Sequence, residues 1–152
     1  MKMTLENKAR DFVTAMHVNM AKSMLEDACR SGAVSPEFAF NNAYRDGFVV
    51  GATLVMGNMH QSRVEELARM TRFFGERDSL QDLLNGIAED HWAQLQASPG
   101  VGGEHRAEPL FREGFLLGAK TAFYTAEPVK KVIKKALGLK WWQSLPPLPK
   151  GQ

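Results

Sequence analysis

The chain has 152 residues, 44% of them hydrophobic and 24% charged, a composition typical of one globular domain. A single cysteine, Cys29, excludes a framework of intramolecular disulfides, and the N-terminus lacks the apolar run of a signal peptide, so a cytoplasmic protein is expected. The net charge of +2 hides an asymmetry, because residues 128–152 carry six lysines and no acid while residues 1–127 are mildly acidic. Such a local charge block predicts an interaction surface near the C-terminal end.

The first predicted helix runs from Thr4 to Ser31, and Gly32 marks its end. Apolar residues recur along this segment at intervals of three or four, which is the spacing of one helix face. They are Leu5, Ala9, Phe12, Val13, Met16, Met20, Met24 and Ala28. We expect this stripe to face the core.

A second helix is predicted from Pro36, because a serine followed by proline is typical of a helix start. It would be unusually long if it continued to Phe74, so a kink or stop is expected near Gly57. A further helix should then begin at about Gln61.

Residues 75–79 have turn composition, and the most regular amphipathic pattern of the chain follows them. Its apolar positions are Leu80, Leu83, Leu84, Ile87, Ala88, Trp92 and Leu95. Residues 97–103 predict a flexible surface connection, and residues 104–125 predict the next helix.

The last predicted helix runs from Glu127 to Leu137, with Gly138 as its C-terminal cap. One face is apolar and the other carries Lys130, Lys131, Lys134 and Lys135. The proline-rich segment 139–149 cannot continue a helix and is expected to be extended.

One nine-residue pattern occurs twice, as Tyr44–Ala52 and again 67 residues later as Phe111–Ala119. Five positions are identical and the other four exchange only similar residues, which indicates an internal duplication with repeats at about 4–74 and 78–138. The first copy alone also fits a strand fenced by glycines, but the second copy has helical spacing. We therefore predict an all-α domain over residues 1–138, with five or six helices built from two duplicated hairpins, and a separate tail at 139–152.

Both copies place glycines one helical turn apart, at Gly47 and Gly51 and at Gly114 and Gly118. Each interior glycine costs about 1 kcal/mol of helix stability relative to alanine, so some compensation is expected. We predict that the two helices cross closely at these glycines; a ligand groove lined by them is the alternative. A membrane span is not expected, because the apolar run is only about half of the ~20 residues needed.

Arg45 and Arg112 recur in the two copies, each next to an acid. Close to the crossing, each arginine can pair with the acid of the other copy. If both lie adjacent and unpaired, they form an anion site instead.

The four histidines share no metal-ligand spacing with one another or with Cys29. His91, beside Glu89 and Asp90, is expected to be a solvated neighbour of these acids rather than a general base. No phosphate-binding loop occurs. We therefore expect no metal, no cofactor and no enzymatic activity.

The basic C-terminal end supplies the candidate partner-binding residues: Lys130, Lys131, Lys134, Lys135, Lys140, Trp141, Trp142 and Leu145. These lysines fit a solvated helix face, an anionic membrane surface or phosphate contacts. The tryptophans favour docking of a protein, because the tail cannot bury such large apolar groups by itself.

The segment Phe111–Ala119 resembles the F-x-x-G-F-x-x-G-A helix of small, mostly uncharacterised helical proteins of phages, prophages and other mobile elements. This resemblance covers about nine residues in each copy and carries no catalytic residue. It implies an accessory protein that acts on a macromolecule encoded by the host or by the element.

The function expected from these observations is binding of another protein through the basic tail, together with self-association. A nucleic-acid-binding protein that uses the same lysines is the alternative, although six lysines without arginine give only nonspecific attraction. A small-ligand protein or enzyme with its pocket at the helix crossing is a further alternative.

Overall fold

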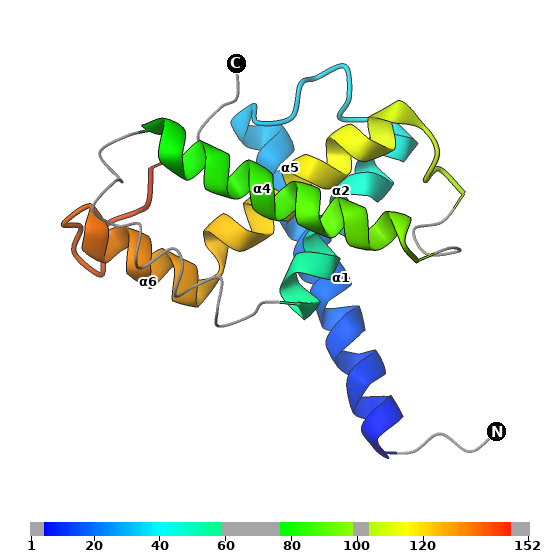
Figure 1. The fold of residues 1–152 in the computed structure, drawn as a ribbon, viewed down its shortest axis with the longest axis horizontal. Helices are drawn as coiled ribbons and strands as arrows, with labels where there is room; N and C mark the ends of the chain where they lie inside the picture. Colours follow the sequence, from blue (N-terminus) through cyan, green and yellow to red (C-terminus); the bar gives the residue numbers. More distant parts are fainter. Residues whose placement is uncertain (1–4, 59–76, 99–103, 147–152) are drawn as a thin grey trace.

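A computed structural model describes residues 5–58, 77–98 and 104–146 of the chain. These residues form five α-helices and no strand, as Figure 1 shows, so the predicted all-α class is confirmed. The helices are α1 (Leu5–Ser31), α2 (Asn42–Gly57), α4 (Arg77–Gln96), α5 (Pro109–Thr125) and α6 (Glu127–Ala136).

Helices α2 and α5 pack against each other at the centre of the molecule. Helix α1 lies mainly on α2, and α4 lies mainly on α5, so each central helix carries one outer helix. The largest fully buried side chains include Phe48 from α2 and three phenylalanines from α5: Phe111, Phe115 and Phe123. The core is therefore built around the two segments that share the nine-residue pattern.

The start of α2 differs from the prediction. The helix begins at Asn42 rather than Pro36, and residues 36–40 form turns. The Asn41 side chain accepts a hydrogen bond from the Tyr44 backbone N–H at 2.9 Å, which satisfies a donor that the first helical turn leaves free. Asn41, and not Ser35, is therefore the N-cap of α2.

Two further predicted helix boundaries differ from the structure, and three predicted helix ends are confirmed. Helix α5 begins at Pro109 rather than residue 104, and α4 begins at Arg77, inside the turn expected at 75–79. The expected stop of α2 near Gly57 is confirmed, as are the ends of α1 and α5. The helix expected from Gln61 lies outside the described residues.

The ends of α1 and α4 satisfy their carbonyl groups in different ways. After α1, Gly32 has a left-handed φ of +83°, and the Val34 N–H donates to the Ala28 carbonyl at 3.1 Å. After α4, the Arg106 guanidinium donates to the Leu95 and Ser98 carbonyls at 2.6 and 2.7 Å. A glycine turn thus closes the first outer helix, and a distant side chain closes the second.

The C-terminal tail turns back onto the body instead of extending away from it. Gln143 N–H donates to the Lys140 carbonyl at 3.0 Å, and the Gln143 side chain accepts from the Lys140 N–H at 2.7 Å. The prediction of an extended segment is therefore wrong over 140–143, while residues 147–149 lie outside the described residues. Tyr124 of α5 anchors the tail, because its hydroxyl donates to the Pro146 carbonyl at 2.7 Å.

Candidate functional site

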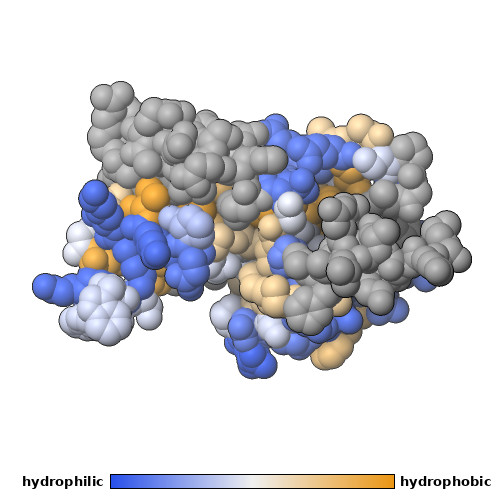
Figure 2. Space-filling view, turned by 90° about the horizontal axis from the view of Figure 1, so that it is seen from below, coloured by the Kyte–Doolittle hydropathy of each residue, from blue (hydrophilic) through white to orange (hydrophobic). Residues whose placement is uncertain are grey.

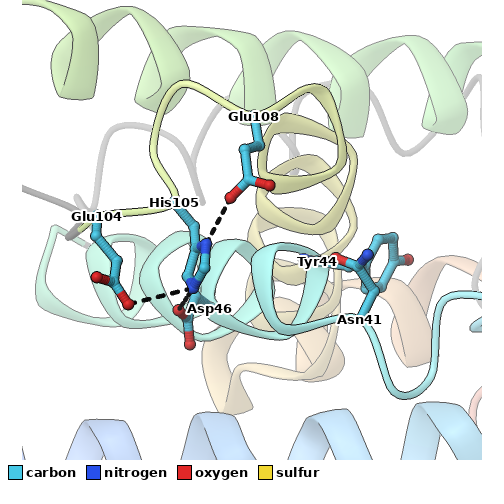
Figure 3. A network of polar contacts seen from close by, with 6 residues as sticks. All are labelled: Asn41, Tyr44, Asp46, Glu104, His105 and Glu108. Carbon is cyan, nitrogen blue, oxygen red and sulfur yellow. Dashed lines mark hydrogen bonds and ion pairs between the residues drawn. The ribbon is translucent and has the colours of Figure 1, made fainter.

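Helices α2 and α5 meet at their glycines, and Figure 3 shows the two helices crossing. A Cβ atom added to Gly47 would lie 2.0 Å from the Phe111 carbonyl oxygen, and one added to Gly51 would lie 2.2 Å from that of Phe115. The backbones are thus in direct contact, and the glycine hydrogen that points in this direction faces a carbonyl oxygen. Any side chain larger than hydrogen would separate the helices.

The contact is reciprocal. A Cβ on Gly114 would lie 2.0 Å from the Tyr44 carbonyl oxygen, and one on Gly118 would lie 2.1 Å from that of Phe48. Each contact between a glycine of α2 and a carbonyl oxygen of α5 therefore has an equivalent contact between a glycine of α5 and a carbonyl oxygen of α2. The two residues of one contact lie 67 positions from the corresponding residues of the other. Six buried positions of α2 have buried counterparts in α5 at the same offset: residues 44, 47, 48, 51, 52 and 55.

The crossing is filled by backbone and by aromatic rings. Trp92 of α4 packs edge-on against Phe115 with ring centroids 5.1 Å apart, and it also contacts Phe111 at 6.1 Å. Phe38 stacks on Tyr44 of α2, with ring centroids 5.3 Å apart. Burial, together with the charges of Glu113 and Cys29, raises the pKa of Tyr44 to about 12, so this phenol stays neutral at physiological pH.

The two arginines beside the crossing do not pair with acids of the other copy, which corrects the prediction. Arg45 pairs with Glu26 of α1 and also donates to the Ala39 carbonyl at 2.8 Å. Arg112 binds both carboxylate oxygens of Glu89 in α4, at 2.8 and 2.9 Å. Each guanidinium thus pairs with an acid of an outer helix. The anion site required both arginines to be unpaired, so it is not formed.

His105 is the centre of a surface network that joins the turn before α5 to α2 (Figure 3). Its Nδ1 lies 2.5 Å from Glu108, and its Nε2 lies 3.5 Å from Glu104 and 3.8 Å from Asp46. The hydrogen bond to Glu108 is the main reason that the pKa of His105 is raised, and the three carboxylate charges add to it, while partial desolvation opposes them. When it is protonated, the imidazole helps to hold this turn against α2 through its contact with Asp46.

His91 was expected to be solvated, and this prediction was wrong. It is buried on α4, where its Nδ1 lies 2.8 Å from the Ile87 carbonyl and donates to it, while Nε2 has no hydrogen-bond partner among the described residues. The adjacent acids misled the prediction, because neighbours in sequence point to different faces of a helix.

The exposed part of the C-terminal end is called the tail surface here, and it consists of Lys131, Lys135, Lys140, Trp141 and Trp142. All five side chains are exposed; the exposed fraction is 87% for Trp141 and 64% for Trp142. In Figure 2, hydrophilic residues stand beside hydrophobic ones at the left, where α6 and the tail lie. The exposed tryptophans and lysines follow one another closely along the end of α6 and the tail.

Three other candidate residues of this region have partners within the chain. Lys130 pairs with Glu127 at 3.4 Å, and Lys134 donates to the Trp141 carbonyl at 3.0 Å. Leu145 packs against the core, so its assignment to an exposed contact surface is corrected. Lys134 and Leu145 therefore help to position the tail, whereas the pair of Lys130 lies within α6.

A second exposed apolar region was missed by the sequence analysis, which assigned all the α1 methionines to the core. Met16 and Met20 are each 45% exposed. They line an open surface hollow on α1, called the methionine face here: Ala15, Met16, Asn19, Met20, Ser23, Met24 and Asp27. No local signal distinguished this face, because apolar spacing is the same on a covered and an uncovered helix.

Searches for resemblance to known proteins add nothing to this geometry. No protein-family model, curated protein or solved structure matches the chain. Within the described residues, no group of three or more His, Cys, Asp or Glu side chains is placed to hold a metal ion, and no helix is long and apolar enough to cross a membrane.

Proposed function

We propose that this chain is a non-enzymatic accessory protein that binds another protein through the tail surface. The observation that carries this proposal is the exposure of Trp141 and Trp142 on a segment that is itself held in place. A tryptophan that is 87% exposed contributes little to folding, so its apolar area remains available for a partner.

Three interactions fix the tail before any partner arrives. Lys134 holds the Trp141 carbonyl, Gln143 closes a turn with Lys140, and Tyr124 holds the Pro146 carbonyl. A segment ordered in advance loses less conformational entropy on binding, which leaves more of the contact energy as affinity. This supports a built contact surface rather than a loose end.

The chemistry of the tail surface defines the kind of partner. Exposed Lys131, Lys135 and Lys140 near the indoles favour a protein surface that combines apolar pockets with acidic groups. In this proposal the partner is encoded by the host or by a mobile element, as the F-x-x-G-F-x-x-G-A resemblance implies. Trp141 and Trp142 act as the anchors that become buried on binding, and the lysines steer the encounter.

The proposal is tested by capture from the native cell with the full chain as bait. The double variant Trp141→Ala/Trp142→Ala should lose a partner that the wild type retains, because each anchor tryptophan contributes roughly thirtyfold or more in affinity. Phe40→Ala is the matched control, since Phe40 is also an exposed aromatic residue but lies on the connection between α1 and α2. Equal capture by all three proteins would contradict the proposal.

Nucleic-acid binding by the same lysines is distinguished by salt. Fluorescence anisotropy with a single-stranded oligonucleotide would show affinity that falls steeply with salt concentration if phosphates are the ligand. Tight binding in this assay, with no protein captured through the tryptophans, would replace the proposed function.

A further inference from the structure

Three ammonium groups of the tail surface have no partner in the chain. Lys131, Lys135 and Lys140 are exposed, and within the described residues none of their side chains makes an ion pair or a hydrogen bond. Glu127 is the only acid of α6, and it pairs with Lys130. Residues 128–152 contain no acid. The chain therefore leaves these three positive charges uncompensated.

Two of these charges lie one helical turn apart. Lys131 and Lys135 occupy positions i and i+4 of α6, which are about 6 Å apart along the helix axis. Like charges at this spacing repel one another. Lys135 lies in the last turn, where the helix dipole favours a positive charge, but Lys131 lies one turn earlier. Acidic groups placed over both lysines would relieve the repulsion.

The exposed indoles begin where this pair of lysines ends. Lys134 donates to the Trp141 carbonyl at 3.0 Å, and the Leu139 N–H donates to the Lys134 carbonyl at 2.8 Å, so Trp141 is held beside the C-terminal end of α6. Leu137, which is 42% exposed, adds an apolar side chain at the same end. A partner that lies along α6 therefore meets two cations and then an apolar patch.

The opposite face of α6 restricts what the tail surface can bind. Val129 and Ile133 are buried in the core, so α6 has no free apolar face to insert into a membrane. Arginine, whose planar fork matches phosphate, is absent from residues 128–152, where every cation is a lysine. Indoles beside lysines favour a protein surface with acidic and apolar side chains.

We infer that the segment that docks on the tail surface is an acidic helix of the partner, with two carboxylates one turn apart and an apolar side chain beyond them. This inference rests on the proposed function and specifies the partner's contact segment. A helix beside α6 has the same rise per residue, so its carboxylates at positions i and i+4 match Lys131 and Lys135. Its apolar side chain then packs on Trp141 and Trp142.

The test is titration of the isotope-labelled full chain with helical, alanine-rich peptides. The first peptide carries two glutamates at positions i and i+4 and a leucine one turn further on the same face. The second has glutamine in place of both glutamates, and the third has its glutamates on opposite faces. At low salt, the first should bind roughly three- to tenfold more tightly than the others.

The indole N–H signals in the NMR spectrum report where the peptide binds. Those of Trp141 and Trp142 should shift with the first peptide, because both side chains are exposed. The signal of Trp92, which packs against Phe115 inside the molecule, is the internal control and should not shift.

A matched pair of variants tests the lysines. Lys131→Glu should weaken binding of the first peptide roughly three- to tenfold. It should leave α6 folded, because a glutamate one turn before Lys135 forms a favourable helical pair. Lys22→Glu makes the same charge change at an exposed lysine of α1 and should leave binding unchanged.

The outcomes separate the inference from the proposed function. Equal binding of the three peptides, or no effect of Lys131→Glu, overturns the acidic helix, while a protein captured through the tryptophans would still support the proposed function. Tighter binding at the same indoles by a single-stranded oligonucleotide or by phosphatidylglycerol vesicles would overturn it in favour of phosphate groups. Equal capture by the wild type and the tryptophan variant contradicts the proposed function, and the inference fails with it.

Discussion

The two halves of this molecule share their central contact and differ in how their outer helices are covered. Gly47 and Gly114 occupy equivalent places in the crossing and meet equivalent carbonyl oxygens. The outer helices diverge, because α4 buries Ile87 whereas α1 exposes Met20 at the same relative position. In Figure 1 the start of α4 lies on the same side as α6, while the start of α1 projects alone. The glycines therefore determine how the halves meet, and the surroundings determine what each outer helix buries.

The largest effect should come from truncating the covered position. Ile87→Ala leaves a cavity in the core and should lower the free energy of unfolding by about 2–5 kcal/mol. The equivalent Met20→Ala removes a half-exposed side chain and should cost about 0.5 kcal/mol or less in the monomer. Urea denaturation of both variants at low protein concentration measures this difference. Equal losses would show that the α1 face is covered in the same way as that of α4.

The arginine clamps should give smaller and similar effects in the two halves. The pairs Arg45–Glu26 and Arg112–Glu89 are both partly exposed to solvent, so a double-mutant cycle should find a coupling energy of about 0.2–1 kcal/mol for each. Increasing salt should weaken both, because exposed charges are screened. A coupling energy that is unaffected by salt would contradict the exposed geometry.

A pH effect on stability is expected at His105, in the turn before α5. Its folded-state pKa is raised, mainly by the hydrogen bond to Glu108, so its contribution to stability is fully present below about pH 6.5 and is lost as the pH rises through the folded-state pKa. The urea midpoint should therefore fall across this window, and His105→Gln should flatten that part of the profile. If the variant keeps the wild-type slope, another group is responsible.

The sequence predicted those features whose cause lies within one helical turn. Helical spacing gave the all-α class, Gly57 gave the end of α2, and Pro128 with Gly138 bracketed α6. The start of α2 was predicted wrongly because Ser35 and Asn41 are both residue types that cap helices. Asn41 is the N-cap in the structure, through a hydrogen bond to the Tyr44 backbone N–H that the sequence alone does not show.

Tertiary partners could not be predicted in the same way. Whether His91 or Met20 is buried depends on what packs over each helix. The spacing of apolar residues within a helix carries no information about such packing. The tail was expected to extend, but Tyr124 and Gln143 fold it back through hydrogen bonds across 22 and 3 residues. The exposure of the tryptophans was expected from the segment itself, and the position of Leu145 against the core was not.

The direct contact of α2 and α5 at their glycines is tested most clearly by three alanine substitutions compared by chemical denaturation. Gly47→Ala and Gly114→Ala should each destabilise the chain by about 1–3 kcal/mol, and by the same amount, because each new methyl group would meet a carbonyl oxygen 2.0 Å away. Gly86→Ala on α4, whose Cβ direction is open, should instead stabilise it by up to about 1 kcal/mol. If Gly47→Ala or Gly114→Ala also stabilised the protein, the two central helices would not meet where the structure places them.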